Sequence, residues 1–219
     1  MNSLSDEIKV IVFDVDGTIM DSIGRIVECM QAAACACGVA EPSVQAVRNI
    51  IGITLHHAVE VLFPEQNPEK IDQITDEYRR LYNLWEIERP TSLFSGAMKT
   101  MQTLKQRGYR LAIATGKSQR GLARLYGDQE LCSLFSASVT GDQVKSKPHP
   151  MMLQKLMNQL EIKPSEAVMV GDSVLDLQMA GNCDVRSIGI TWGVHSREQL
   201  QQETPVAVID DLSQLLEIF

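Results

Sequence analysis

The hydrophobic positions of this chain follow two kinds of pattern. In the first pattern, apolar residues recur every three or four positions, as they do from Leu153 to Leu160, and this spacing predicts helices. Between such helices lie short apolar runs, at 10–13, 109–116, 135–141, 167–173 and 185–193. Short apolar strands that alternate with helices are typical of a parallel sheet covered on both faces. The pattern predicts an α/β core with a doubly wound, Rossmann-like parallel sheet.

The segment 21–90 has a different pattern. It carries three helical stripes, beginning at Ile23, Leu55 and Ile71, and no strand candidate. Prolines at 42, 64, 68 and 90 separate these stretches. We therefore expect a small α-helical cap domain at 21–90, inserted after the first strand of a core domain formed by 1–20 and 91–219.

Composition narrows the class of protein. The chain has 219 residues, of which 44% are hydrophobic and 22% charged, as in soluble globular proteins, and no stretch is apolar enough to predict a membrane span. The net charge of -8 disfavours nucleic acid as a partner. Five cysteines without a CxxC pair predict neither a disulfide framework nor a zinc site. Because the N-terminal segment is acidic and unlike a signal peptide, we expect a cytoplasmic protein. We expect a monomer or a homodimer.

Polar residues follow three of the predicted strands. Asp14 and Asp16 end the first strand, Thr115 and Gly116 end the second apolar run, and Asp172 ends the run at 167. The carboxyl ends of parallel strands meet at one edge of a sheet, so these residues should line one crevice. Several carboxylates in one crevice repel one another unless a cation joins them, and oxygen ligands without His or Cys favour Mg²⁺. The sequence predicts a magnesium site.

Four short motifs carry a resemblance to a known family. The segments "DVDGT" from Asp14, "ATGK" from Ala114, "KSKPHP" from Lys145 and "GDSVLD" from Gly171 occur in this order. Together they resemble the four ordered motifs of the haloacid dehalogenase superfamily, and within it the phosphatases with a helical cap. The overall pattern is most similar to phosphoglycolate phosphatases. The resemblance implies the doubly wound fold and Mg²⁺-dependent hydrolysis of a small phosphorylated metabolite through an aspartyl-phosphate.

The resemblance also implies catalytic roles at the first motif. Asp14 matches the nucleophile that attacks phosphorus. Asp16 matches the general acid and base, which protonates the leaving alcohol and then activates water, and its backbone carbonyl matches a metal ligand.

The later motifs match residues that bind phosphate and metal. Thr115 and Gly116 match the phosphate-binding second motif, and Lys147 matches the cation that neutralises phosphoryl oxygens, with Lys145 as a competitor. Asp172 matches the metal-binding acid. Asp176, one helical turn later, is similar to the supporting acid. Lys117 matches no position of this kind, and we expect it at the rim of the site.

Alternatives remain open at this stage. An acid at Asp16 disfavours dehalogenation. A sugar-phosphate mutase of the β-phosphoglucomutase type shares all four motifs, although the segment after "DVDGT" lacks the expected histidine and Leu55 stands where its cap arginine would be. A third hypothesis is a catalytically silent binding or regulatory module of the same fold. As substrate we favour 2-phosphoglycolate, with sugar phosphates, pyrophosphate and nucleotide monophosphates also open.

Overall fold

The strand that ends in Asp14 lies inside a six-stranded parallel sheet. The computed structural model describes residues 7–125 and 129–219. The strands lie in the order β3-β2-β1-β4-β5-β6, with β1 (Val10–Phe13) paired in parallel to both β2 (Arg110–Thr115) and β4 (Ala167–Gly171). The others are β3 (Phe135–Thr140), β5 (Arg186–Ile190) and β6 (Ala207–Ile209). This order is that of a Rossmann-like sheet, so the predicted fold class is confirmed.

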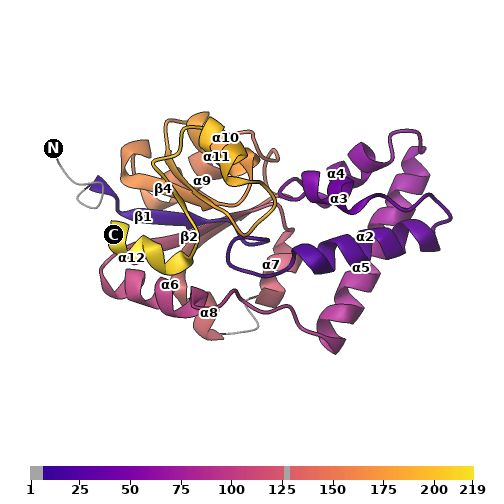
Figure 1. The fold of residues 1–219 in the computed structure, drawn as a ribbon, viewed down its shortest axis with the longest axis horizontal. Helices are drawn as coiled ribbons and strands as arrows, with labels where there is room; N and C mark the ends of the chain where they lie inside the picture. Colours follow the sequence, from indigo (N-terminus) through magenta and orange to yellow (C-terminus); the bar gives the residue numbers. More distant parts are fainter. Residues whose placement is uncertain (1–6, 126–128) are drawn as a thin grey trace.

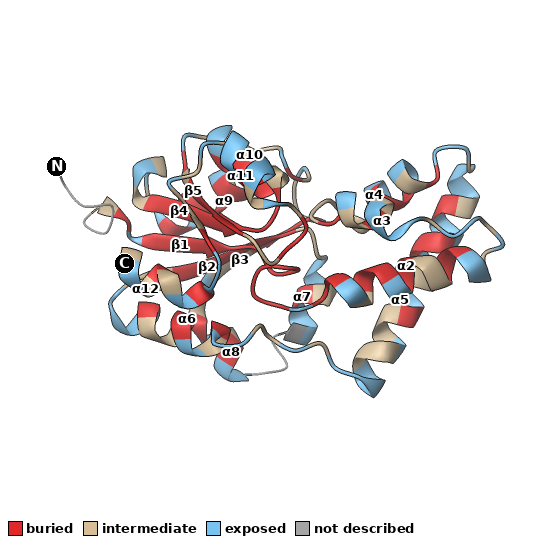
Figure 2. Cartoon of the chain, viewed as in Figure 1, coloured by how far each residue is buried: buried red, intermediate tan, exposed pale blue. Residues whose placement is uncertain are grey.

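Each central strand is buried on both faces because helices cover the sheet on both sides (Figures 1 and 2). In β1, Ile11 and Phe13 enter one apolar cluster while Val10 and Val12 enter another. The first cluster also contains side chains of α6 (Ala97–Gln106), α8 (Gln129–Leu134), the 3-10 helix Leu212–Gln214 and α12 (Leu215–Ile218). The second contains side chains of α9 (Met151–Leu160) and α10 (Val174–Gly181). Successive side chains of β1 thus point to opposite faces of the sheet and pack against the helices on each face.

Four helices between β1 and α6 lie to one side of the sheet (Figure 1). They are α2 (Ile23–Ala36), α3 (Val44–Asn49), α4 (Leu55–Leu62) and α5 (Pro68–Glu88), which we call the helical segment. Their apolar faces form one buried cluster. Among the residues that the structure describes, Val194 is the only buried member of this cluster from outside 21–90. The two connections to the core run together, since the Asp21 amide donates to the Ser92 carbonyl at 3.0 Å.

Several boundaries differ from those predicted. The structure has four helices in 21–90, whereas three were predicted. The helix that the pattern missed is α3, which buries only Val47 and therefore has no apolar stripe. Strand β6 was not predicted, since its three residues are too short for a period-two pattern. Two further helices, α7 (Gln119–Leu125) and α11 (Arg197–Gln202), follow β2 and β5. The division into domains at 21–90 stays a prediction.

None of the helices in the described ranges 7–125 and 129–219 is long and apolar enough to cross a membrane.

Candidate active site

The carboxyl ends of β1, β2 and β4 bring the predicted polar residues to one edge of the sheet. Asp14 follows β1 and Asp172 follows β4, its direct neighbour, and both carboxylates are buried. Gly17 lets the loop after β1 pass this point, because it has a φ of 79° and a Cβ there would lie 2.5 Å from Asp172 Oδ2. The crevice expected from the strand ends is therefore present.

Lys147 is enclosed between two of the aspartates. Its Nζ lies 2.8 Å from Asp14 Oδ1 and 2.6 Å from Asp176 Oδ1, and its side chain has no exposed surface. Burial alone would lower the pKa of Lys147, but the two carboxylates outweigh burial and raise it, so the ammonium stays charged. Ser173, at the start of α10, fixes Asp176 by donating to its Oδ2 from the hydroxyl at 2.6 Å and from the amide at 3.2 Å. Lys147 is thus held as a buried cation; its competitor Lys145 is exposed.

Three carboxylates converge beside this lysine. Oxygens of Asp14, Asp172 and Asp176 all lie within 4.8 Å of one another. Asp172 accepts a hydrogen bond from the Thr18 hydroxyl and another from the Val194 amide, each at 2.9 Å.

The electrostatics of this acidic triad favour a cation. Burial, reinforced by Asp176, raises the pKa of Asp172 to about 7, and burial likewise raises the pKa of Asp14 although Lys147 opposes the shift. Among the described residues, Asp14 Oδ1 has no donor oriented to hydrogen-bond with it, despite the ion-pair contact with Lys147. Three buried carboxylates with one lysine lack positive charge, and their oxygen donors suit a divalent cation.

Asp16 lies in a different environment from the triad. Its Oδ1 accepts a hydrogen bond from the Ser22 hydroxyl at 2.6 Å and contacts Lys117 Nζ at 2.7 Å. The side chain of Lys117 is only 13% exposed, so the expectation of a rim position is wrong. Its place directly after Thr115 and Gly116, at the end of β2, was the signal that pointed to the site.

Thr115 and Gly116 lie at the same strand edge but differ in access. Thr115 is fully buried, and its hydroxyl accepts a hydrogen bond from the Lys117 amide at 3.2 Å. Gly116 lines the cavity, where a Cβ would lie 2.6 Å from the carbonyl oxygen of Gly52 and 2.8 Å from that of Ile53. The loop after α3 therefore rests on Gly116, and no larger residue fits there without moving that loop.

A cavity of about 690 Å³ opens above these groups, with Asp14 and Asp16 in its lining. The loop 50–54 and apolar side chains of α2 contribute one wall, and Tyr78 and Tyr82 of α5 contribute another. Three arginines also line it, namely Arg79, Arg120 and Arg124. Residues 50–54, which follow α3, thus face the cavity.

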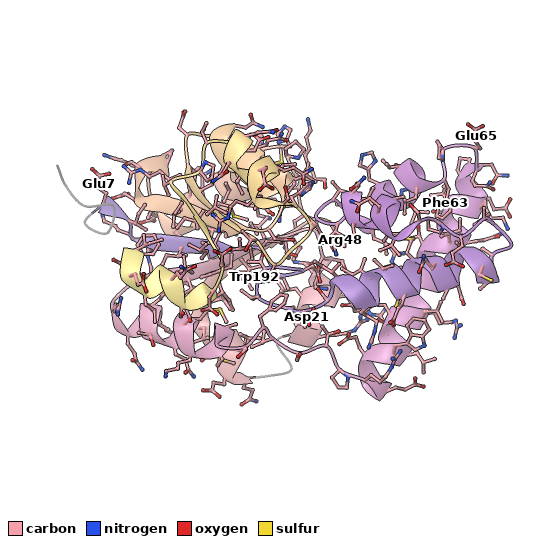
Figure 3. The ribbon with its side chains drawn as sticks, in the orientation of Figure 1. Glu7, Asp21, Arg48, Phe63, Glu65 and Trp192 are labelled. Atoms are coloured by element: carbon pink, nitrogen blue, oxygen red, sulfur yellow. The ribbon has the colours of Figure 1, made fainter. Side chains whose placement is uncertain are left out.

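Hydrogen bonds connect the helical segment to the core. A guanidinium nitrogen of Arg48 donates to the Gly193 carbonyl at 2.7 Å, and the Thr54 amide donates to the Ser146 hydroxyl at 3.0 Å. Figure 3 shows Arg48 between the two parts, whereas Phe63 and Glu65 lie at the far end of the helical segment. These contacts hold the helical segment over the carboxyl edge of the sheet.

A parallel Rossmann-like sheet with a lysine and three acids at its carboxyl edge defines an α/β protein equipped to bind a cation and an anionic ligand. The model of the haloacid dehalogenase-like hydrolases matches residues 11–190, and the chain belongs to this family.

Named relatives agree with this assignment. The probable phosphatase IndB of Dickeya dadantii is 30% identical over 209 residues, which cover 94% of this chain and 91% of that protein. A phosphoglycolate phosphatase of Vibrio vulnificus is 29% identical over 223 residues, covering 97% and 96%. The structure of a haloacid dehalogenase-like hydrolase from Bacteroides fragilis has a TM-score of 0.87 at 25% identity, covering 95% of this chain and 99% of that one. The resemblance stated from four motifs is confirmed, as is the expectation of an enzyme related to phosphatases.

Proposed function

We propose that the protein is a Mg²⁺-dependent phosphomonoester hydrolase that acts through an aspartyl-phosphate at Asp14. One observation carries the proposal: Asp14 lines the cavity while its carboxylate lies against Lys147 and within the acidic triad. A nucleophile, a buried cation and a set of metal-binding oxygens therefore meet at one point. These are the parts that phosphoryl transfer requires.

In the first step, a carboxylate oxygen of Asp14 attacks phosphorus and the bond from phosphorus to the leaving oxygen breaks. Asp16, two residues further along the loop and also in the cavity lining, donates its proton to that leaving oxygen. Lys147 stabilises the negative charge of the phosphoryl oxygens, because its ammonium is kept charged by its carboxylate partners.

In the second step, Asp16 as a carboxylate takes a proton from water while the water oxygen attacks phosphorus. The bond from phosphorus to Asp14 breaks, phosphate leaves, and both aspartates return to their starting states. The Gly116 amide, at the end of β2 and in the cavity lining, is proposed to bind a phosphoryl oxygen together with the Thr115 hydroxyl.

Asp14 and Asp172, with the backbone carbonyl of Asp16, are the groups we assign to Mg²⁺, and Asp176 supports them. The fit rests on the charge of the buried acidic triad and on its all-oxygen donor set. Bound Mg²⁺ would lower the repulsion between the Asp14 carboxylate and an anionic phosphate.

We propose a small phosphorylated metabolite as substrate, with 2-phosphoglycolate as the preferred candidate. Arg120 and Arg124 lie one turn apart on α7 and line the cavity, and neither has an ion-pair or hydrogen-bond partner among the described residues. Such guanidinium groups suit a second anionic group, such as a carboxylate, on the substrate. The helical segment 21–90 acts in this proposal as a cap that excludes water.

The test is phosphate release by the purified protein from a panel of phosphomonoesters that includes 2-phosphoglycolate, measured with Mg²⁺ and with chelator. We expect metal-dependent release, with the highest kcat/KM for a substrate that carries a second anionic group. Conversion of a sugar 1-phosphate to its 6-phosphate without net phosphate release would support the mutase instead. Absence of both reactions would support a silent binding module.

A further inference from the structure

Lys117 connects the core to the helical segment at Asp16. Its Nζ lies 2.7 Å from Asp16 Oδ1, donates to the Tyr82 hydroxyl at 3.3 Å and lies 5.1 Å from the centroid of the Tyr82 ring. Lys117 and Asp16 lie in the loops that follow β2 and β1, whereas Tyr82 belongs to α5. The three residues, which we call the Lys117 bridge, therefore span both parts of the molecule.

The ammonium of Lys117 is largely enclosed by its two partners, because the side chain of Lys117 is only 13% exposed. Tyr82 is held in turn by stacking on Tyr78, with ring centroids 5.7 Å apart. A partly buried ammonium with two fixed partners is a rigid element rather than a mobile surface lysine.

The two donors to Asp16 use the same oxygen. Ser22 Oγ and Lys117 Nζ both approach Oδ1, whereas Oδ2 has no hydrogen-bond partner in the ranges 7–125 and 129–219. Two contacts at one oxygen fix the carboxyl rotamer and leave the other oxygen available in the cavity lining.

We propose that Lys117 is a positioning residue that aims Asp16 for proton transfer, and that Tyr82 of the helical segment holds Lys117 in place. This role rests on the proposed function, because it assumes that Asp16 exchanges protons with the leaving group and with water. It differs from a substrate-binding role, in which Lys117 would contact the ligand and affect every substrate alike.

The two roles are separated by the leaving group. An alkyl phosphomonoester such as 2-phosphoglycolate needs a proton on its leaving oxygen, whereas p-nitrophenolate leaves without one. Lys117→Met should lower kcat/KM for 2-phosphoglycolate by about 10²-fold and for p-nitrophenyl phosphate by less than about tenfold. Rapid mixing of Lys117→Met with p-nitrophenyl phosphate should show a burst of nitrophenol equal to the enzyme concentration. The burst is expected because attack by water on the aspartyl-phosphate also needs Asp16 and becomes the slow step.

Lys145→Met is the matched control, since Lys145 is an exposed lysine two residues from Lys147, and its activity should equal that of the wild type. Tyr82→Phe removes one hydroxyl and keeps the ring. It should lower kcat/KM for both substrates in the same order as Lys117→Met, by smaller factors. It also carries the test if Lys117→Met does not fold.

Equal losses for the two substrates without a burst would overturn the positioning role and favour substrate binding. Unchanged activity of Lys117→Met would overturn it as well. A wild-type protein that releases no phosphate from any ester of the panel would instead overturn the proposed function, and the role of Lys117 with it.

Discussion

Lys147 and Lys117 each contact an aspartate of the same loop, yet the two pairs differ in what holds them. Lys147 lies wholly within the core, between Asp14 and Asp176, and has no exposed side-chain surface. Lys117 is 13% exposed and shares its contacts between Asp16 and Tyr82 of the helical segment. The first pair therefore has no contact with the helical segment, whereas the lysine of the second pair also contacts Tyr82 of α5. The carboxylate of Asp14 is thus held by a lysine enclosed in the core, and that of Asp16 by a lysine that also contacts the helical segment.

The largest expected effect comes from removing either carboxylate. Asp14→Asn and Asp16→Asn should each lower kcat for an alkyl phosphomonoester by at least about 10²–10⁴-fold while leaving the fold intact. Only Asp16→Asn should still acquire ³²P from a labelled activated ester after acid quench, because it keeps the nucleophile. Near wild-type kcat in Asp14→Asn would contradict the assignment of the nucleophile.

The next largest effect is expected in the free energy of unfolding when either lysine is replaced. Lys147→Met leaves Asp14 and Asp176 buried without their cation, so the free energy of unfolding should fall by about 3–5 kcal/mol. Lys117→Met should cost less, since Asp16 keeps the Ser22 hydrogen bond. Urea titration at pH 7 in chelator measures both, and equal losses would contradict the difference between the pairs.

A third effect concerns pH and metal. The pKa of Asp172 is raised by burial, and by Asp176, to about 7, above its value in the unfolded chain. Between about pH 4 and pH 7 the folded state therefore holds a proton that the unfolded state has lost, so this group makes the metal-free protein less stable as pH rises. The gain in Tm on adding Mg²⁺ should accordingly grow from pH 5 to pH 7.

Asp172→Ala is the control for this pH dependence. It should flatten the difference between Tm in Mg²⁺ and Tm in chelator across that range, and raise the Mg²⁺ concentration for half-maximal rate by more than about tenfold. Comparing the two Tm values at each pH cancels His195, whose pKa is lowered by burial and whose effect has the opposite sign. An unchanged metal titration would contradict the ligand role of Asp172.

The smallest effect is expected at the contact between Gly116 and the loop 50–54. Gly116→Ala places a Cβ against the Gly52 and Ile53 carbonyl oxygens and should displace that loop. We expect about a tenfold loss in kcat/KM with little change in Tm, because the shift affects the cavity wall and not the sheet. Gly24→Ala, where a Cβ meets nothing within 4 Å, provides the control.

The sequence allowed prediction of the residues whose positions follow from the sheet alone. Asp14, Thr115 and Asp172 meet because three parallel strands end at one edge, and apolar runs reveal those strands without any tertiary information. Tyr82 could not be assigned in this way, since its place in the helical stripe of α5 does not show which element it will face. The contact between Lys117 and Tyr82, which helps to cover the lysine, depends on that packing, so Lys117 was wrongly expected at the rim.

The pairing of β1 has a consequence for how the protein is made. Val10 pairs with Arg110 on one side and with Ala167 on the other, so the strand that presents Asp14 has its neighbours much later in the chain. During translation, α2 to α5 leave the ribosome before either neighbour, and their contacts with one another are closer in sequence than the pairings of β1. Pairings so distant in sequence form slowly, because the entropic cost of closing a long loop comes before the stabilising contacts form. We therefore expect the nascent chain to order its helices first and its reactive strand last.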